Sequence, residues 1–385
     1  MEASTLLLVA ACVLVVVVAH DDDLVTMKRF VSTFQGCADP SWSAPNTSVC
    51  QWLGVTCSDS SPHRVVEFVW NYRSCGGTLN LTSLPSLLSR LLLNSNNFSG
   101  CVDLTRLPPS LAVLYLNENL LSGPVNLSQL PESLQQLFLY QNRFTGTLDL
   151  TQLPSQLELL YAYLNFFHGR LDLTRLPPSL QMLYLYGTPF SGEVDLTQLP
   201  SNLQQLYINY CGLSGSIDLT QLPLSLEQLD ISTNSFTGSL NLTNLPPNVQ
   251  VLYAMDNNFS GSLDLGHLPV GLIDLYLSQN QFSGLLDLTK LPADINWLLL
   301  NNNAFTGPLH LSSLPEYLQF LFLGSNHFEG NLDLSALPAN LQELEVVGNS
   351  QLCGTTNSSV GCRELQLPRH CTCIGNGAVS CGVCY

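Results

Sequence analysis

The chain has 385 residues, of which 45% are hydrophobic and only 11% are charged, against roughly 25% charged residues in an ordinary globular domain. Its 12 Lys and Arg against 29 Asp and Glu give a formal charge of −17, and no run of basic residues could follow a phosphate backbone. We therefore expect neither nucleic acid nor an anionic membrane surface as a partner, and 13 cysteines argue against a typical cytosolic chain.

The first segment, residues 1–19, predicts a signal peptide. A continuous apolar stretch runs from Leu6 to Ala19, and the chain then turns polar. The stretch is too short to span a bilayer comfortably, and Val17 and Ala19 supply the small residues of a cleavage site. An uncleaved signal anchor is the alternative. No later apolar run or hydrophobic tail suggests a membrane span or a lipid anchor, so we expect an extracellular or cell-surface protein, with membrane association only if an anchor is missing from this chain.

Residues 20–64 are polar and bear three cysteines, Cys37, Cys50 and Cys57. A repeat array follows them, and an array exposes its core at both ends. We therefore expect this segment to be an N-terminal cysteine cap rather than a catalytic domain.

The segment 65–352 repeats with a constant period of 23 residues, marked by twelve Leu-Pro pairs without insertion or deletion. One unit, from Leu134 to Pro154, combines spaced leucines, Asn142, a Phe-Thr-Gly phrase and a Leu-Asp-Leu phrase, which matches the leucine-rich repeat template. Counting from Val65 to Leu341 gives thirteen units. The sequence predicts an α/β-type solenoid of mostly short parallel β-strands, a leucine-rich repeat horseshoe or arc with cysteine-bearing caps.

Each position in the unit has an expected physical role. The leucines point inward from a short strand, and the residues between them form a concave sheet. The Asn column should bond backbone groups of neighbouring turns; it contains Asn96, Asn119, Asn142, Asn165, Asn234, Asn257, Asn280, Asn303, Asn326 and Asn349. Thr188 and Cys211 stand in the same column, and we expect Cys211 to be a buried thiol rather than a disulfide partner. Gly146 permits a turn closed to other residues, and Leu148-Asp149-Leu150 alternates like a second short strand.

Residues 353–385 predict a C-terminal cysteine-rich cap. Six cysteines lie in it, Cys353, Cys362, Cys371, Cys373, Cys381 and Cys384, and six cysteines allow fifteen pairings. A zinc site built from the last four of them with His370 is the alternative to disulfides, but an oxidising compartment favours disulfides. We expect no metal and no cofactor.

Catalytic motifs are missing from the sequence. It has no glycine-rich phosphate loop, no Gly-x-Ser-x-Gly elbow and no His-Glu-x-x-His pattern, and its seven histidines share no repeat position. Solenoid faces serve mainly as extended binding surfaces. We therefore expect a protein that is not an enzyme and has no catalytic residues.

An acidic column follows the position of Asp149, with members Asp103, Asp149, Asp172, Asp195, Asp218, Asp264, Asp287 and Asp333. Calcium binding is one interpretation, but a flat row of carboxylates does not enclose an ion, so hydrated side chains are favoured. Asn80, Asn126 and Asn241 interrupt the column within N-x-[ST] sequons. The candidate glycosylation sites are Asn46, Asn80, Asn97, Asn126, Asn241, Asn258 and Asn357.

The predicted concave face is rich in aromatic residues and nearly free of charge. The candidate ligand-binding residues are Tyr115, Phe138, Tyr140, Tyr161, Tyr163, Tyr184, Tyr186 and Tyr207. Exposed aromatic fields are typical of binding hot spots. The alternative is that repeat duplication copied a tyrosine whose cross-strand stacking supports the sheet. Asp230 in the same column indicates that the fold does not require an aromatic residue there.

Several phrases carry a closer resemblance. Leu183-Tyr184-Leu185, Phe190-Ser191-Gly192 and Asp195-Leu196-Thr197-Gln198-Leu199-Pro200 resemble the surface-antigen leucine-rich repeat family of kinetoplastid protists, which implies a secreted or lipid-anchored adhesion or immune-interaction protein. The cap resembles that of plant-type extracellular leucine-rich repeat proteins, which implies a disulfide between Cys50 and Cys57. Plant polygalacturonase-inhibiting proteins are a second likeness through this cap and the overall size, although their Gly-x-Ile-Pro phrase is replaced here by Leu-Asp-Leu.

These observations predict a recognition or adhesion protein that binds an extracellular protein or carbohydrate on its concave aromatic face. A structural coat or surface antigen without a specific ligand is one alternative. An inhibitor of a secreted polysaccharide hydrolase is the other.

Overall fold

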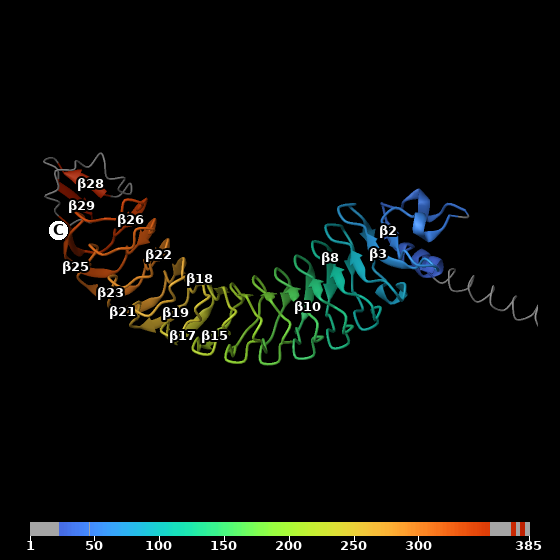
Figure 1. The fold of residues 1–385 in the computed structure, drawn as a ribbon, viewed down its shortest axis with the longest axis horizontal. Helices are drawn as coiled ribbons and strands as arrows, with labels where there is room; N and C mark the ends of the chain where they lie inside the picture. Colours follow the sequence, from blue (N-terminus) through green and yellow to red (C-terminus); the bar gives the residue numbers. More distant parts are fainter. Residues whose placement is uncertain (1–22, 46, 355–370, 375–377, 382–385) are drawn as a thin grey trace, which may run out of the picture. The chain divides into compact units, whose positions relative to one another are not determined.

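The structure is a computed structural model that describes residues 23–45, 47–354, 371–374 and 378–381 (Figure 1). It divides into two compact units. We call residues 1–169 with 175–189 the N-terminal unit, and residues 170–174 with 190–385 the C-terminal unit. The predicted signal peptide, Asn46, Asn357 and much of the C-terminal cysteine segment lie outside the described residues.

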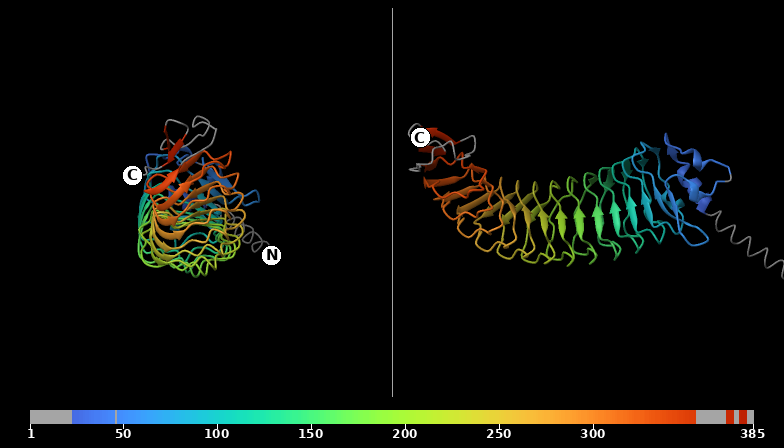
Figure 2. Two further views of the ribbon diagram at one scale, coloured as in Figure 1. Left: turned by 90° about the vertical axis from the view of Figure 1, so that its left-hand side faces the viewer. Right: turned by 45° about the horizontal axis from the view of Figure 1, so that its top comes forward.

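The 23-residue period places one short parallel strand in each turn of a solenoid (Figure 2). In the N-terminal unit these strands are β3 (Val65–Val69), β5 (Arg90–Leu92), β7 (Val113–Tyr115), β9 (Gln136–Phe138), β11 (Leu159–Tyr161) and β13 (Met182–Tyr184). In the C-terminal unit they are β14 (Gln205–Tyr207), β16 (Gln228–Asp230), β18 (Val251–Tyr253), β20 (Asp274–Tyr276), β22 (Trp297–Leu299), β24 (Phe320–Phe322) and β26 (Glu343–Glu345). Leu160 pairs in register with Leu137 and Leu183. The described residues thus contain thirteen turns, as the repeat count predicts.

A second set of short parallel strands follows the first in each unit. The N-terminal unit holds β6 (Ser99–Gly100), β8 (Leu120–Gly123), β10 (Arg143–Gly146) and β12 (Phe166–Phe167). The C-terminal unit holds β15 (Ser214–Ser216), β17 (Ser235–Ser239), β19 (Asn258–Gly261), β21 (Gln281–Leu285), β23 (Ala304–Gly307), β25 (His327–Leu332) and β27 (Gln351–Gly354).

The position of this second strand corrects the sequence prediction. We expected a strand at Leu148–Leu150, but β10 ends at Gly146, where φ is +84°. Both of those leucines are buried, while the Asp149 carboxylate accepts the Thr151 amide at 2.9 Å. The Thr151 amide therefore closes a local turn with Asp149 and does not bond to the adjacent repeat. No strand pairing forms at this position.

The core is built from the inward leucines and from a second buried column that is phenylalanine in most turns. In the C-terminal unit, Phe236, Phe259, Phe282, Phe305 and Phe328 are fully buried. Successive rings in this column lie 6.1 to 6.3 Å apart between centroids. In these turns the second strand carries the phenylalanine, so apolar burial holds the two strand sets together.

The Asn column performs the predicted backbone role. Asn142 donates to the carbonyls of Leu116 at 2.9 Å, Leu139 at 3.1 Å and Tyr140 at 3.3 Å, and its side-chain oxygen accepts the Leu121 amide at 3.0 Å. One buried amide thus bonds four backbone groups, three of which have no backbone partner, while the Tyr140 carbonyl also accepts the Glu118 amide at 2.9 Å. Cys211, in the same column, is buried and carries a reduced thiol, as predicted.

The N-terminal cap covers the first turns. Residues 23–31 are helical, and the short helices η1 (Pro40–Trp42) and η2 (Val49–Gln51) follow; a third short helix, η3 (Leu81–Ser83), lies in the first repeat. Strand β2 (Val55–Cys57) adds to β3 antiparallel, and β1 (Phe34–Gln35) pairs with β4 (Gly76–Gly77). Within the cap, Asp23 is 2% exposed and forms an ion pair with Arg64 at 2.7 Å.

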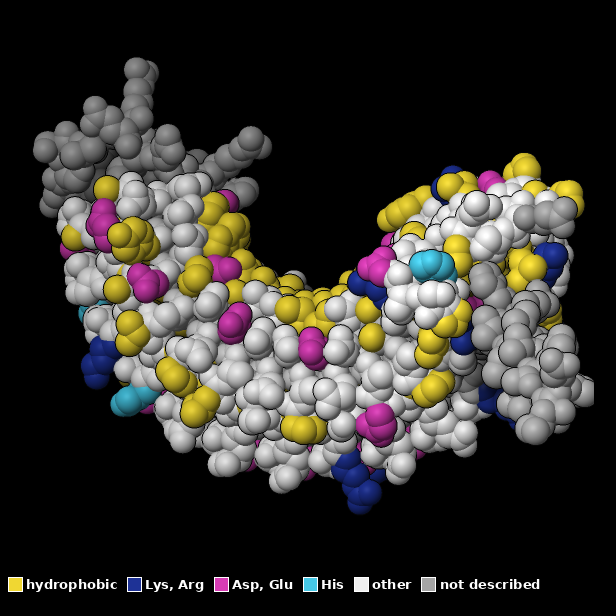
Figure 3. Space-filling view, turned by 45° about the vertical axis from the view of Figure 1, so that its right-hand side comes forward, with side chains coloured by type: hydrophobic (Ala, Val, Ile, Leu, Met, Phe, Trp, Pro, Cys, Tyr) yellow, Lys and Arg dark blue, Asp and Glu magenta, His cyan; other side chains and the backbone are white. Residues whose placement is uncertain are grey.

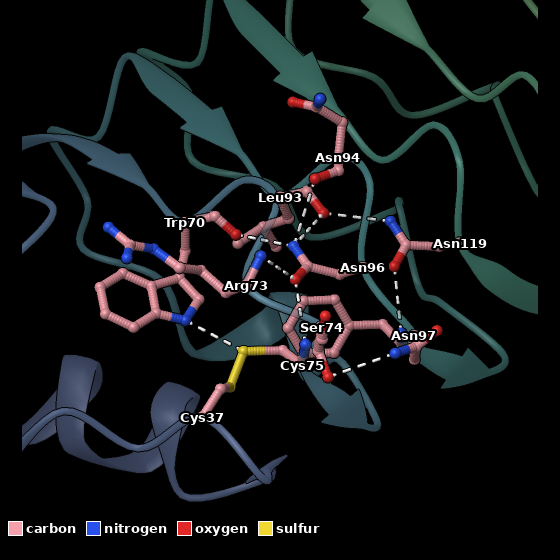
Figure 4. Close-up of a disulfide and its surroundings, with 11 residues drawn as sticks. Cys37, Trp70, Arg73, Ser74, Cys75, Leu93, Asn94, Asn96, Asn97 and Asn119 are labelled. Atoms are coloured by element: carbon pink, nitrogen blue, oxygen red, sulfur yellow. Dashed lines mark hydrogen bonds between the residues drawn. A yellow bond between two sulfur atoms is a disulfide. The ribbon is translucent and has the colours of Figure 1, made fainter.

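Two disulfides stabilise this cap. The structure contains the bond between Cys50 and Cys57 that the resemblance implies. A second bond, which the sequence analysis did not propose, joins Cys37 to Cys75 (Figure 4). Cys75 belongs to the first repeat, so this bond ties the cap to the array directly. The Trp70 indole donates to the Cys75 sulfur at 3.0 Å.

Near the C-terminus, β28 (Cys371–Ile374) and β29 (Ala378–Cys381) form an antiparallel pair that places Cys371 opposite Cys381. The disulfide pairing of the six C-terminal cysteines, and the zinc alternative, lie outside what the structure describes. Within the described residues, no helix has the length and hydropathy needed to cross a membrane.

Candidate ligand-binding face

The parallel strands of the N-terminal unit place alternate residues on opposite sides of the sheet. Leu160 in the middle of β11 is fully buried, and Tyr161 beside it points to the outer side and is half-buried. The same alternation holds in β9 and β13, and in β7 Leu114 is buried and Tyr115 half-buried, although Val113 is also buried. Each strand pairs with the next so that residues one 23-residue repeat apart lie side by side. Equivalent outward side chains therefore line up across the strands.

The first outward column is a continuous ring stack. Tyr115 and Phe138 lie 4.2 Å apart between centroids with 5° between their planes. Phe138 and Tyr161 follow at 4.4 Å and 7°, and Tyr161 and Tyr184 at 4.4 Å and 6°. Because the rings cover one another's faces, this column presents ring edges and hydroxyl groups to the outside.

A second stack runs beside the first. Tyr140, Tyr163 and Tyr186 have centroid spacings of 4.4 Å and 4.3 Å, with planes within 12° of parallel. Phe138 and Tyr140 connect the two stacks at 6.1 Å. We call these seven residues the tyrosine ladder: Tyr115, Phe138, Tyr161, Tyr184, Tyr140, Tyr163 and Tyr186.

Polar contacts fix the ladder at its margins. The Tyr115 hydroxyl donates to Gln136 Oε1 at 2.5 Å, and the Tyr161 hydroxyl lies 3.1 Å from Met182 Sδ. The Tyr140 hydroxyl donates to Glu118 at 3.4 Å. The rings are thus held in one arrangement before any ligand arrives, which lowers the entropy cost of binding.

The environment of the ladder favours neutral phenols. Burial, followed by the neighbouring Tyr184 hydroxyl, raises the pKa of Tyr161 to about 12. Burial is also the first cause of the raised pKa of Tyr163, Tyr184 and Tyr186. At neutral pH the face therefore carries hydroxyl donors and acceptors without charge. Figure 3 shows how sparse lysine and arginine are on the side of the molecule that it presents.

The structure brings together seven of the eight predicted aromatic residues. The eighth, Tyr207, belongs to the C-terminal unit, where its hydroxyl donates to Gln228 Oε1 at 2.5 Å. The next residue in its column, Asp230, is buried, and its carboxylate accepts the amide and hydroxyl of Ser232 at 2.9 Å and 2.6 Å. Asp230 therefore interrupts the aromatic column within this unit.

Beyond that interruption the outward face of the C-terminal unit is aromatic again, but less regular. Tyr253 and Tyr276 lie 4.7 Å apart with 37° between their planes. Trp297 and Phe320 stack at 3.7 Å. Sequence reasoning missed these last two because they occupy the first outward position of their strands, a column that is aliphatic or polar in most other turns.

The acidic column has a local structural role. Asp149 accepts both the amide and the hydroxyl of Thr151, at 2.9 Å and 2.7 Å, and its equivalents make the same turn. Asn126 makes it with Ser128 at 2.9 Å and 2.8 Å, which explains why Asp and Asn interchange in this column. In the described part of the chain, no three His, Cys, Asp or Glu side chains are grouped to hold a metal ion.

Among the predicted glycosylation sites within the described residues, Asn97, Asn126, Asn241 and Asn258 are exposed, and Asn80 is half-buried. Occupancy at these five asparagines stays a prediction.

Residues 20–58 match the family model for a leucine-rich repeat N-terminal domain. The structure is similar to that of the Arabidopsis receptor kinase HAESA in complex with the peptide hormone IDA and the co-receptor SERK1, with a TM-score of 0.69 and 28% identity over 86% of this chain and 58% of that one. The chain thus spans less than two thirds of that receptor chain. The fold is a leucine-rich repeat solenoid.

Two further structures share this fold. YopM from Yersinia enterocolitica has a TM-score of 0.54 and 27% identity over 70% of this chain and 57% of that one. A plant ice-binding protein has a TM-score of 0.50 and 19% identity over 87% and 96% of the two chains, which shows the fold alone. No curated protein matches the chain. The likeness to the kinetoplastid surface-antigen family stays a prediction.

Proposed function

We propose that the chain is a non-enzymatic, secreted or cell-surface recognition protein that binds an extended segment of an extracellular protein on the tyrosine ladder. The observation that carries the proposal is the ladder itself: seven aromatic side chains held on one outward face, uncharged at neutral pH. Tyrosine combines a large apolar ring with a hydroxyl and is enriched among residues that dominate binding energy.

The ring arrangement favours a peptide over a flat aromatic or sugar-stacking ligand. Stacked neighbours cover the ring faces, so the accessible groups are edges and hydroxyls. An extended peptide supplies carbonyls for the hydroxyls and side chains for the apolar edges. The similar Arabidopsis receptor kinase is in complex with a peptide hormone, which supports the same class of partner. Adhesion or immune interaction, as in the kinetoplastid resemblance, would use this face.

The experiment selects binders from a displayed library of random dodecapeptides with the secreted wild-type protein. It then measures their affinity for a Tyr161/Tyr163/Tyr184/Tyr186→Ser variant. Each hot-spot tyrosine contributes about 2 kcal/mol or more, so we expect a loss of at least about 1000-fold.

A Tyr210→Ser variant is the matched control, because its side chain is more than two-thirds exposed and lies outside the ladder, in the C-terminal unit. Matched thermal melts establish that each variant is folded. Equal affinity for the ladder variant and the wild type contradicts the proposal. Failure to select any peptide leaves the coat or surface-antigen function as the better account.

A further inference from the structure

A cleft of about 530 Å³ lies in the C-terminal unit, on the flank of the solenoid where the chain enters the parallel strands. It extends over the approaches to β18, β20, β22 and β24 and does not include the tyrosine ladder. Its lining residues are Pro247, Asn248, Gln250, Gly271, Ile273, Asp294, Asn296 and Tyr317. The volume falls within the range of small-molecule binding sites, about 300–1,000 Å³.

The cleft coincides with a gap in a repeated side-chain contact. In most turns a Ser or Asn two residues after the Leu-Pro proline reaches back to a carbonyl of the preceding turn. Ser133 bonds the Pro109 carbonyl at 2.8 Å, and Asn248 bonds the Leu224 carbonyl at 2.8 Å. Asn340 makes the equivalent bond to Glu316 at 2.9 Å.

Three successive turns lack a residue suited to that contact. Gly271 has no side chain to offer to the Pro247 carbonyl, which lines the cleft. Asp294, when ionised, cannot donate to a carbonyl. The Tyr317 side chain is 61% exposed. The depression therefore lies where three consecutive turns lack a Ser or Asn at this position.

The floor of the cleft is nevertheless rigid. Backbone bonds join Ile273 to Gln250 at 2.8 Å, Asn296 to Ile273 at 2.7 Å, and Gln319 to Asn296 at 2.9 Å. The backbone hydrogen bonds between successive turns thus continue beneath the missing side-chain contacts. A site on such a floor is held ready for a ligand.

We infer that this cleft binds a neutral oligosaccharide. Sugar hydroxyls need partners that donate and accept, and the amides of Asn248, Gln250 and Asn296 do both. The Asp294 carboxylate accepts two hydroxyls, and the Tyr317 ring and Ile273 offer apolar surface to the C–H face of a pyranose. Among the residues that the structure describes, no lysine or arginine lines the cleft, so uronic or sulfated sugars meet Asp294 without a compensating cation.

The test measures retention of cellohexaose, mannohexaose, laminarihexaose, xylohexaose and chitohexaose by the full secreted protein, with trigalacturonate as the anionic comparison. We expect one neutral series to bind with an affinity between about micromolar and millimolar and the anion not to bind. In a Gly271→Asn variant the new amide reaches Pro247 as Asn248 reaches Leu224, fills the cleft and weakens binding at least about 10-fold. The site accepts this change sterically, since a Cβ on Gly271 lies 3.9 Å from its nearest neighbour.

Variants at two further positions test whether the loss of sugar binding is specific to the cleft. Asn340→Gly removes the same type of contact outside the cleft and should leave sugar affinity unchanged. Tyr317→Phe should retain binding, whereas Tyr317→Ala should lose it, because the ring surface and not the hydroxyl is used.

The inference is overturned if no neutral hexaose binds the wild type at millimolar concentration, or if folded Gly271→Asn binds as well as the wild type. It is also overturned if the Tyr161/Tyr163/Tyr184/Tyr186→Ser variant loses the sugar, because the sugar would then occupy the tyrosine ladder. Loss of peptide binding alone in that variant concerns only the proposed function.

Discussion

The outward faces of the two units are built on the same frame but differ in their side chains. In the N-terminal unit, Tyr161 continues an unbroken stack of near-parallel rings. In the C-terminal unit, Asp230 interrupts the equivalent column and Tyr253 and Tyr276 are tilted. The inward Asn142 and Asn303 nevertheless bond the backbone in the same way in both units. The difference teaches that the solenoid requires the inward columns, whereas the aromatic ladder is an addition that the fold does not demand.

The largest expected effect tests the shared frame. Replacing Asn142 by Ala in the N-terminal unit, or Asn303 by Ala in the C-terminal unit, leaves three buried backbone groups without partners in each case. The fourth group, the carbonyl of Tyr140 or Asn301, keeps a backbone amide donor. We expect each variant to lose roughly 3 kcal/mol in free energy of unfolding, measured by urea denaturation. Asn142→Thr should lose less, because Thr188 occupies this column naturally. Costs that differ more than about twofold between the two alanine variants would break the claim of a common frame.

The aspartate that interrupts the second face provides the next test. Burial raises the pKa of Asp230, so the folded state favours its protonated form. Its ionisation therefore destabilises the fold as pH rises from the ordinary value of 3.8 through the raised pKa. Asp230→Asn keeps the oxygen that accepts from Ser232 and should gain about 1 kcal/mol at pH 7.

That gain should disappear below pH 3.8, where the wild-type carboxyl is protonated in the folded and unfolded states. Thermal melts of both proteins across this pH range measure it. A gain that persists unchanged in acid would mean that charge burial is not its cause.

A double-mutant cycle compares the stacks themselves. Tyr161 and Tyr184 are nearly parallel at 4.4 Å, so their coupling should approach about 1 kcal/mol, while the tilted Tyr253–Tyr276 pair should show less. Single and double alanine variants, unfolded in urea, give the two coupling energies. Equal couplings would show that ring geometry does not distinguish the two faces.

The smallest effect concerns alkaline stability. Because burial raises the pKa of Tyr161 from 10 to about 12, the neutral phenol stabilises the fold below pH 10, and that contribution is lost between pH 10 and 12. Tyr161→Phe should lose less stability over this range than the wild type, and Phe138 shows that the column accepts a phenylalanine. Tyr210→Phe, outside the ladder, is the control and should follow the wild type.

Much of this structure could be predicted because the repeat encodes it. The 23-residue period predicts the strands, and the Asn column predicts the buried amides such as Asn142. The alternation of apolar and polar residues at 148–150 did not predict the position of the second strand. Leu148 and Leu150 are both buried, but Asp149 between them closes a local turn and no strand forms. The bond from Cys37 to Cys75 depends on how the cap folds back on the first repeat, which spacing does not encode.

The tyrosine ladder and the cleft also differ in how far the sequence predicts them. The ladder was predictable because every ring occupies a repeated position, and register alone brings the rings together. The cleft was not, because Gly271 becomes a depression only through what its neighbours in adjacent turns contribute. Residues that recur at one repeat position are visible in the sequence, whereas the consequence of one missing side chain is not.

The most direct test of the central claim is to map where a selected peptide binds. A dodecapeptide from the library selection, carrying a benzophenone at successive positions, is photo-crosslinked to the wild-type protein, and the modified residues are located by mass spectrometry. Binding on the tyrosine ladder predicts cross-links concentrated on β7, β9, β11 and β13 and their outward side chains. Cross-links concentrated on the acidic column around Asp149, or on the C-terminal unit, would contradict it.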